Sequence, residues 1–175
     1  MTVRFYYAED SNLTYIRTPK CAGMTMETIF LKLHKYEKVV AYPANITYPD
    51  SNSNKFVVVR NPWDRVVSQF EFLRTTRKKF KNVKFYDWFY SQDQRFVKRA
   101  SETYLNISNF YLKFENLEEE VITKLIPNKK KLRIPHLNSS PREFSNYRNY
   151  YIDQRMIDVI AELNKDVIEK VGYDF

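Results

Sequence analysis

The chain of 175 residues contains only two glycines, Gly23 and Gly172, and this scarcity excludes the commonest nucleotide-binding loops. A dinucleotide fingerprint of the form G-x-G-x-x-G needs three glycines close together, and a triphosphate loop of the form G-x-x-x-x-G-K-S/T needs two. A phosphatase loop of the form C-x5-R is excluded as well, because Glu27 stands where such a loop needs its arginine after Cys21. An anion site in this chain must therefore be built without a glycine-rich loop.

The composition is that of a folded, basic protein. Hydrophobic residues make up 43% of the chain and aromatic residues 17%, which excludes a disordered tail and a low-complexity fibre. The length predicts a single domain over residues 1–175. The net charge of +8 favours an anionic substrate or partner. One cysteine and two histidines exclude a disulfide scaffold and a Cys/His zinc site, so we expect no metal.

The amino-terminal sequence MTVRFYYAEDSNL has neither the apolar segment nor the small-residue cleavage site of a secretory signal. No apolar run approaches the ~20 residues that span a bilayer. We therefore expect a cytoplasmic protein that does not associate with a membrane.

Hydrophobic periodicity predicts strands that alternate with helices. Strands are expected at 3–8, 13–18, 38–42, 55–60 and 108–114. Helices are expected at 25–33, 61–79 (capped by Asn61), 85–92, 94–104 and 117–125, followed by one long helix from the cap Asp153 to Val171. This order predicts an α/β fold of three layers, with a mainly parallel central sheet flanked by helices on both faces.

The first candidate site is the turn at 18–25, where a strand ends and a helix begins. Small residues there let the backbone curl, so that free amides and the positive end of the helix dipole form an anion cradle. Lys20 adds a positive charge at its edge and Thr25 adds a hydroxyl. We interpret the segment as a P-loop-like strand-turn-helix phosphate site, the alternative being an ordinary turn with a surface lysine.

The second candidate site follows the apolar strand at 55–60. Arg60 stands at the carboxyl end of that strand, where open α/β sheets bind their ligands. Ser68 lies about two turns into the following helix, and an arginine fork with a hydroxyl suits a phosphate monoester. We interpret Asp64 as a local ion-pair partner that stabilises the helix.

The sequence PKCAGMT, followed by a strand and RNPWDRVVSQF, resembles the paired signature of the sulfotransferases that use 3′-phosphoadenosine 5′-phosphosulfate, PAPS. In that family one loop holds the 5′-phosphosulfate and the second segment holds the 3′-phosphate. The resemblance implies that Arg60 and Ser68 bind the 3′-phosphate. It implies that the phosphosulfate is bound by Lys20, Cys21, Ala22, Gly23, Met24, Thr25 and Met26. Met24 stands where the family usually has threonine, and it offers its backbone amide in place of a hydroxyl.

The resemblance extends to the carboxyl end, where PHLN at 135–138 and GYDF at 172–175 look like the tail of the carbohydrate-type branch. It implies in-line transfer of a sulfuryl group from PAPS to a hydroxyl or amine of an acceptor, with adenosine 3′,5′-bisphosphate (PAP) as the product. In that reaction Lys20 would stabilise the charge on the leaving bisphosphate.

The proton acceptor is the point at which this chain departs from the family. Related carbohydrate sulfotransferases commonly place a histidine between the first helix and the arginine-bearing strand, and this chain has none there. Glu27, within a turn of the cradle, is the favoured catalytic base. His136 is a weaker candidate, because its place in the tail suits loop ordering or a cofactor contact better. His34 lies about 13 Å along the helix, which favours a surface role.

A basic run follows the Ser68 helix and comprises Arg74, Arg77, Lys78, Lys79, Lys81 and Lys84. It is either a solvated surface or a rim that attracts an acidic acceptor such as a glycan. Arg142, in a polar loop, is a further candidate contact for the 3′-phosphate. Cys21 is expected to be a small residue that fits the turn rather than a nucleophile.

Two other functions remain open beside a PAPS-dependent sulfotransferase. A degenerate member of the family would bind PAPS or PAP without catalysis, since the expected histidine is missing. A nucleic-acid-binding module would use the basic run and the aromatic residues. The aromatic residues, however, fall in apolar periodic segments and are expected in the core, so we expect no nucleic-acid partner. The resemblance implies a hydroxyl-bearing acceptor.

Overall fold

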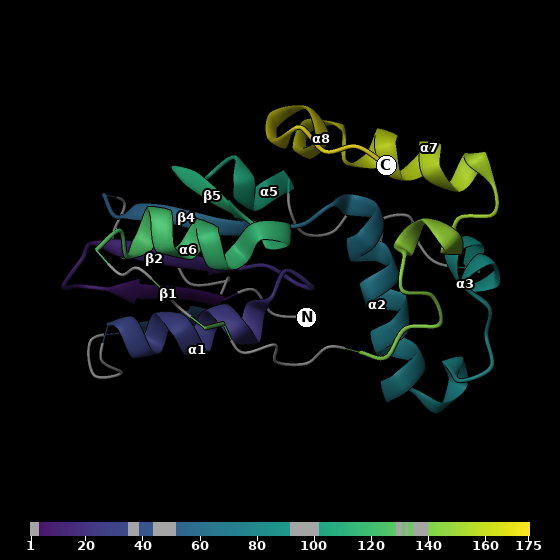
Figure 1. Cartoon of the computed structure of the whole chain (residues 1–175), viewed down its shortest axis with the longest axis horizontal. Helices are drawn as coiled ribbons and strands as arrows, with labels where there is room; N and C mark the ends of the chain where they lie inside the picture. Colours follow the sequence, from purple (N-terminus) through teal and green to yellow (C-terminus); the bar gives the residue numbers. More distant parts are fainter. Residues whose placement is uncertain are drawn as a thin grey trace. The chain divides into compact units, whose positions relative to one another are not determined.

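The structure, a computed structural model, describes residues 4–34, 39–43, 52–91, 102–128, 131, 133–134 and 140–175. The chain divides into two compact units (Figure 1). The first comprises Met1–Val59 and Thr103–Asn138, and the second comprises Arg60–Glu102 and Ser139–Phe175. A single domain over 1–175 stays a prediction.

The described strands form one sheet in the order β3-β1-β2-β4-β5. They are β1 (Arg4–Ala8), β2 (Leu13–Arg17), β3 (Val39–Pro43), β4 (Asn54–Val59) and β5 (Phe110–Lys113). The strands β2, β4 and β5 pair in parallel, while β1 pairs antiparallel with both β2 and β3. Among the described strands, therefore, β1 alone runs against the others. The predicted α/β fold with a mainly parallel sheet is confirmed in this form.

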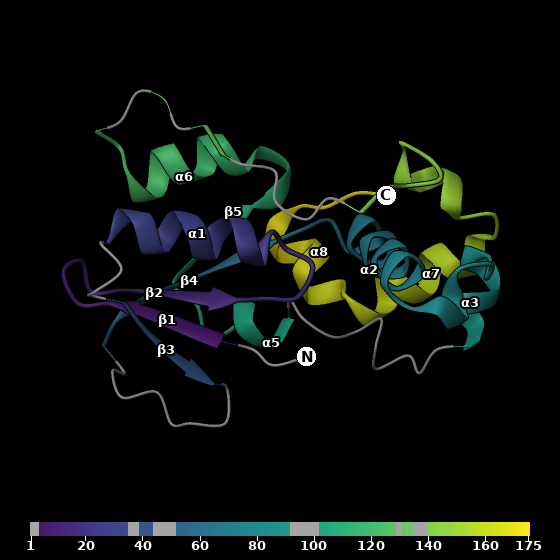
Figure 2. The ribbon, with the colours of Figure 1, turned by 90° about the horizontal axis from the view of Figure 1, so that it is seen from below.

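The first unit has its core on one face of the sheet. Phe56 and Val58 of β4 pack there with α1 (Gly23–Leu33) and α6 (Leu117–Leu125), which lie on the same side of the sheet (Figure 2). Val57 and Val59 point to the other face, because side chains alternate along a strand, and they are fully buried as well. Burial on both faces explains the continuous apolar run of β4. Helices on both faces, as three layers require, stay a prediction.

The second unit is built on helices around an aromatic core. Its helices are α2 (Pro62–Thr76), η2 (Lys78–Phe80), α3 (Phe85–Ser91), η4 (Tyr147–Tyr150), α7 (Gln154–Leu163) and α8 (Lys165–Val171). The rings of Phe70, Phe85 and Trp88 have centroids 5.3, 5.4 and 5.8 Å apart, distances typical of packed aromatic pairs. The predicted cap Asn61 is confirmed, since its side chain accepts from the amides of Trp63 and Asp64 at 3.1 and 3.3 Å.

The long carboxyl-terminal helix was wrongly predicted as continuous. Asn164 interrupts it between α7 and α8, with φ −123° and ψ 23°. Its backbone N–H and its side-chain amide both donate to the carbonyl of Ile160, at 3.1 and 2.9 Å. A buried asparagine that satisfies the last carbonyls of one helix ends that helix.

Two other predicted elements differ from the structure. The helix expected at 94–104 is described only as α5 (Glu102–Leu105), because 92–101 lie outside the described residues. The helix expected to reach residue 79 ends at Thr76, and the strand expected to reach residue 114 ends at Lys113, before the 3-10 helix η3 (Phe114–Asn116).

Candidate functional site

The turn between β2 and α1 has an unusual backbone. Lys20 and Ala22 adopt positive φ angles of 64° and 53°, although neither is glycine. Left-handed backbone costs a non-glycine residue roughly 1–2 kcal/mol, and such residues cluster at ligand clamps. Thr18 anchors the turn by donating to the carbonyl of Val58 at 2.9 Å. The backbone thus curls at Lys20 and Ala22, while Gly23 begins the helix without a positive φ.

The cradle presents the amino end of α1. Ala22 is the N-cap, and its side chain offers no acceptor to the amides of the first helical turn. Its backbone carbonyl accepts from the N–H of Met26 at 2.9 Å. Lys20 is half-buried at the edge of the turn, and Met24 is 46% exposed. An oxyanion held here would meet backbone N–H groups and a lysine charge.

Three other cradle residues serve the core of the first unit. Thr25 and Met26 are buried, with Met26 in the hydrophobic core. Cys21 is buried as a free thiol and donates to the Pro19 carbonyl at 3.5 Å. A buried thiol in this setting has the packing role expected of it from the sequence.

Glu27 lies one turn into α1 and forms an ion pair. Its Oε2 is 3.2 Å from Nη1 of Arg17, the last residue of β2. No pattern in the sequence indicates this pair, because neither periodicity nor a motif relates a strand end to the following helix. His34 lies at the opposite end of α1, where its Nδ1 is 2.9 Å from Oδ1 of Asp10. The His34 side chain is only 12% exposed, so the surface role expected for it stays a prediction.

A cluster of two arginines and one carboxylate occupies the start of α2 in the second unit. Oδ2 of Asp64 accepts from both Nε and Nη2 of Arg60 at 2.7 Å. Oδ1 accepts from Nη1 of Arg142 at 2.7 Å. The local pair with Arg60 follows from the i,i+4 spacing, whereas the bond to Arg142 joins residues 78 positions apart and has no signal in the sequence.

Ser68 lies on the same face of α2 as Asp64, four residues further along the helix. It is half-buried, and no described residue shares a hydrogen bond with its hydroxyl. The hydroxyls of Thr75 and Thr76 in the same helix instead donate back to helix carbonyls, at 2.9 and 2.6 Å. A serine hydroxyl without such a bond is available to a ligand on this face.

The loop that carries Arg142 is fixed to α2 by a buried glutamate. Glu71 is fully buried, accepts from the Tyr150 hydroxyl at 2.5 Å, and pairs with Nε of Arg74 at 2.7 Å. The amide of Glu143 donates to Glu71 at 3.2 Å and to the Tyr150 oxygen at 2.8 Å. Burial and the bond to Glu71 raise the pKa of Tyr150 to about 12.

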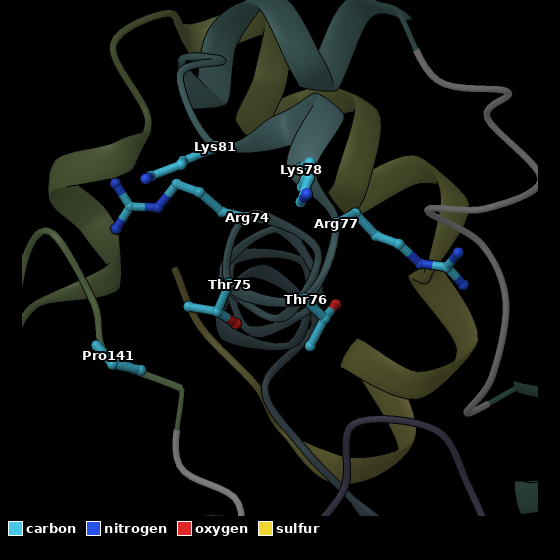
Figure 3. A pocket seen from close by; sticks show the side chains of 7 residues that line it. All are labelled: Arg74, Thr75, Thr76, Arg77, Lys78, Lys81 and Pro141. Atoms are coloured by element: carbon cyan, nitrogen blue, oxygen red, sulfur yellow. The ribbon is translucent and has the colours of Figure 1, made fainter.

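A hollow of about 460 Å³ lies at the carboxyl end of α2 (Figure 3). It is lined by Arg74, Thr75, Thr76, Arg77, Lys78, Lys81 and Pro141. Arg74 is neutralised by Glu71 and Glu143. No described acidic residue pairs with Arg77, Lys78 or Lys81, which are exposed and leave the hollow positively charged.

The predicted site residues fall into two groups, each within one unit. The first is the cradle at 20–26 with Glu27, and the second is Arg60, Ser68 and Arg142. His136 lies outside the described residues. Within the described ranges no cluster of His, Cys, Asp or Glu has the makings of a metal site. None of the helices there has the length and apolar character of a membrane span.

A family model described as the sulfotransferase family matches residues 3–172, nearly the whole chain. The match covers both units and both candidate groups. No curated protein and no solved structure matched the chain.

Proposed function

Because the chain belongs to the sulfotransferase family, whose members transfer a sulfuryl group from PAPS to a hydroxyl or amine, we propose that its two groups of site residues hold opposite ends of one PAPS molecule. PAPS carries phosphate at both ends of its ribose, so a single cradle does not satisfy it. When bound, PAPS supplies the activated sulfuryl group and a bisphosphate leaving group. The residues of the chain bind it, orient it and stabilise charge.

The observation that carries the proposal is the Asp64 cluster. Arginines that already share one carboxylate have their forks aligned before a ligand arrives, and arginine forks match the oxygens of a phosphate. Two guanidinium groups and one carboxylate leave a net positive charge beside the free hydroxyl of Ser68. We assign the 3′-phosphate to Arg60, Ser68 and Arg142.

The 5′ end is assigned to the cradle at 20–26. The amides of the first turn of α1 and the positive end of its dipole favour the phosphosulfate. Lys20 supplies a positive charge that stabilises the leaving bisphosphate during in-line displacement. The acceptor gives up its proton to a base, for which Glu27 and His136 are the candidates.

The acceptor is proposed to be acidic, as in a carboxylated or sulfated glycan. The hollow at the end of α2 supports this choice, because Arg77, Lys78 and Lys81 present charges there that no described residue neutralises. With an acidic and a neutral oligosaccharide as acceptors, the double variant Lys78→Gln/Lys81→Gln should raise KM for the acidic one alone. The matched variant Lys165→Gln/Lys170→Gln on α8 is the control, and equal KM values in both variants would contradict the acidic acceptor.

Calorimetry with PAP tests nucleotide binding, and transfer of labelled sulfate from PAPS tests catalysis. We expect one PAP per chain, with affinity lowered at least tenfold by Arg60→Gln. Binding without transfer to any acceptor would identify a degenerate, non-catalytic member. Absence of PAP binding, together with binding of an oligonucleotide, would overturn the proposal in favour of a nucleic-acid-binding module.

A further inference from the structure

Arg17 lies against the backbone at the start of α1. A Cβ placed on Gly23 would come within 2.7 Å of Nε of Arg17, 3.1 Å of its Cγ and 3.4 Å of its Cδ. Gly23 has no positive φ, so its backbone conformation does not require glycine. A Cβ at this position would instead displace the Arg17 side chain, which occupies the space beside Gly23.

The ion pair with Glu27 fixes the direction of the Arg17 side chain. Glu27 is four residues after Gly23 and therefore lies on the same face of α1. The Arg17 side chain extends past Gly23 to Glu27, and its Nη1 lies 3.2 Å from Oε2 of Glu27. About a quarter of the Arg17 side chain and of the Glu27 side chain is exposed. The guanidinium thus lies along the first turn of the helix, beside the cradle.

Most of the donors on this guanidinium are left for a ligand. Arginine carries five N–H groups. No described residue other than Glu27 forms a hydrogen bond or ion pair with the Arg17 side chain. An arginine side chain that is about a quarter exposed, has donors that no described residue takes up and lies next to the amino end of α1 suits the oxygens of a tetrahedral anion.

We propose that Arg17, held across Gly23 by Glu27, contacts the sulfuryl group of PAPS and so distinguishes the sulfated donor from PAP. The inference rests on the proposed function, which places the phosphosulfate in the cradle. It makes Arg17 a donor-binding residue that the sequence motif does not include, and it gives Glu27 a positioning role through the ion pair.

The test compares the affinities of the purified chain for PAPS and for PAP by calorimetry. Arg17→Gln should weaken PAPS binding about 10- to 100-fold, the range of a lost charge-assisted hydrogen bond, and leave PAP binding within about twofold. Arg17→Lys should recover part of the PAPS affinity. Lys32→Gln, which removes an exposed charge from the same helix, is the matched control and should change neither affinity. Thermal melts of the variants check that they fold.

Glu27→Gln separates a positioning residue from a base. A positioning role predicts a selective loss of PAPS affinity that is not additive with Arg17→Gln, because both changes remove the same ion pair. A loss of turnover with unchanged PAPS affinity would overturn the positioning role.

The outcomes for Arg17 are also distinct from those for the proposed function. Unchanged PAPS affinity in Arg17→Gln, or an equal loss for PAPS and PAP, would overturn the contact with the sulfuryl group while the proposed function stands. Failure of the unmodified chain to bind either nucleotide would overturn the proposed function and this inference with it.

Discussion

At the scale of single residues, Asp64 determines how two arginines are presented. Its two oxygens hold Arg60 and Arg142, and the side chains of Arg60 and Asp64 are only 8% and 13% exposed. Removing one partner of a largely buried ion pair leaves an uncompensated charge, which costs more than the pair itself contributes. Asp64 is therefore important to stability as well as to the orientation of the site.

Asp64→Asn should lower the free energy of unfolding by about 2 kcal/mol, somewhat below the range for fully buried pairs because some solvent reaches the cluster. Inorganic phosphate should restore part of that loss, since the dianion takes the place of the carboxylate between the arginines. Urea denaturation with and without phosphate measures both effects. If phosphate raised the free energy of unfolding equally in the variant and in the unmodified chain, this exchange of anions would be contradicted.

The role of Lys20 is separable from binding. If its charge acts on the leaving bisphosphate, Lys20→Ala should reduce kcat by roughly 10²–10³-fold, the range for a lost preorganised contact, while PAPS affinity falls much less. Steady-state kinetics measures kcat, and calorimetry measures the affinity for PAPS. Lys32→Ala on the exposed side of α1 is the control. A kcat equal to that of the unmodified chain would exclude Lys20 from catalysis.

At the scale of elements, α2 carries three features of the proposed site along its length. Its first turn holds Asp64, its middle holds Ser68 and the buried Glu71, and its end forms the basic hollow. The loop with Arg142 is attached to this helix twice, through Asp64 and through the bonds of Glu71 and Tyr150. The position of Arg142 thus depends on a contact two turns from the site that it serves.

Tyr150→Phe should destabilise the chain by about 1–3 kcal/mol, because Glu71 and the amides of Glu143 and Phe144 lose a buried partner. The effect depends on pH. The pKa of Tyr150 is raised to about 12 in the folded chain from the ordinary value of 10, so its stabilisation is complete below pH 10 and is lost as pH rises toward 12.

Urea denaturation between pH 8 and 12 measures this difference. The difference in free energy of unfolding between the unmodified chain and Tyr150→Phe should narrow above pH 10. Other tyrosines with raised pKa values do not affect this difference, because both proteins contain them. If the difference in free energy of unfolding stayed constant through pH 12, the Tyr150 hydroxyl would not act through its bond to Glu71.

At the scale of the molecule, the sequence was informative where local patterns determine the structure. The apolar run of β4 and the cap Asn61 were predicted and are present. Asp64 was expected to form a local ion pair, and the structure pairs it with Arg60. Tertiary features were not accessible in this way. Glu71 has the sequence pattern of a solvated helix residue, yet it is buried because a loop some 70 residues later supplies its donors.

Two further features depended on packing that the sequence does not display. Asn164 ends α7 by turning its side chain back to Ile160, although the apolar periodicity continues past it. Gly23 was assigned to the curl of the turn, whereas the structure relates it to the space taken by Arg17. In both places the sequence shows the type of the residue but not which residue packs against it in the fold.

The proposed function assigns the two ends of one nucleotide to two separate groups of residues. Adenosine 5′-phosphate and adenosine 3′-phosphate each carry one of the two phosphates of PAP. Their binding therefore tests the two proposed sites one at a time. Arg60→Gln should weaken binding of adenosine 3′-phosphate about 10-fold or more and leave binding of adenosine 5′-phosphate unchanged. Lys20→Ala should weaken binding of adenosine 5′-phosphate by a smaller factor and leave binding of adenosine 3′-phosphate unchanged.

PAP should bind more tightly than either monophosphate with one molecule per chain, because binding at one end raises the effective concentration at the other. Calorimetry gives affinity and stoichiometry together. Two PAP molecules per chain would mean that the cradle and the arginine cluster bind separate anions. Equal losses for both monophosphates in both variants would mean a single shared anion site, since each variant affects one monophosphate alone only where the two phosphates bind at distinct sites.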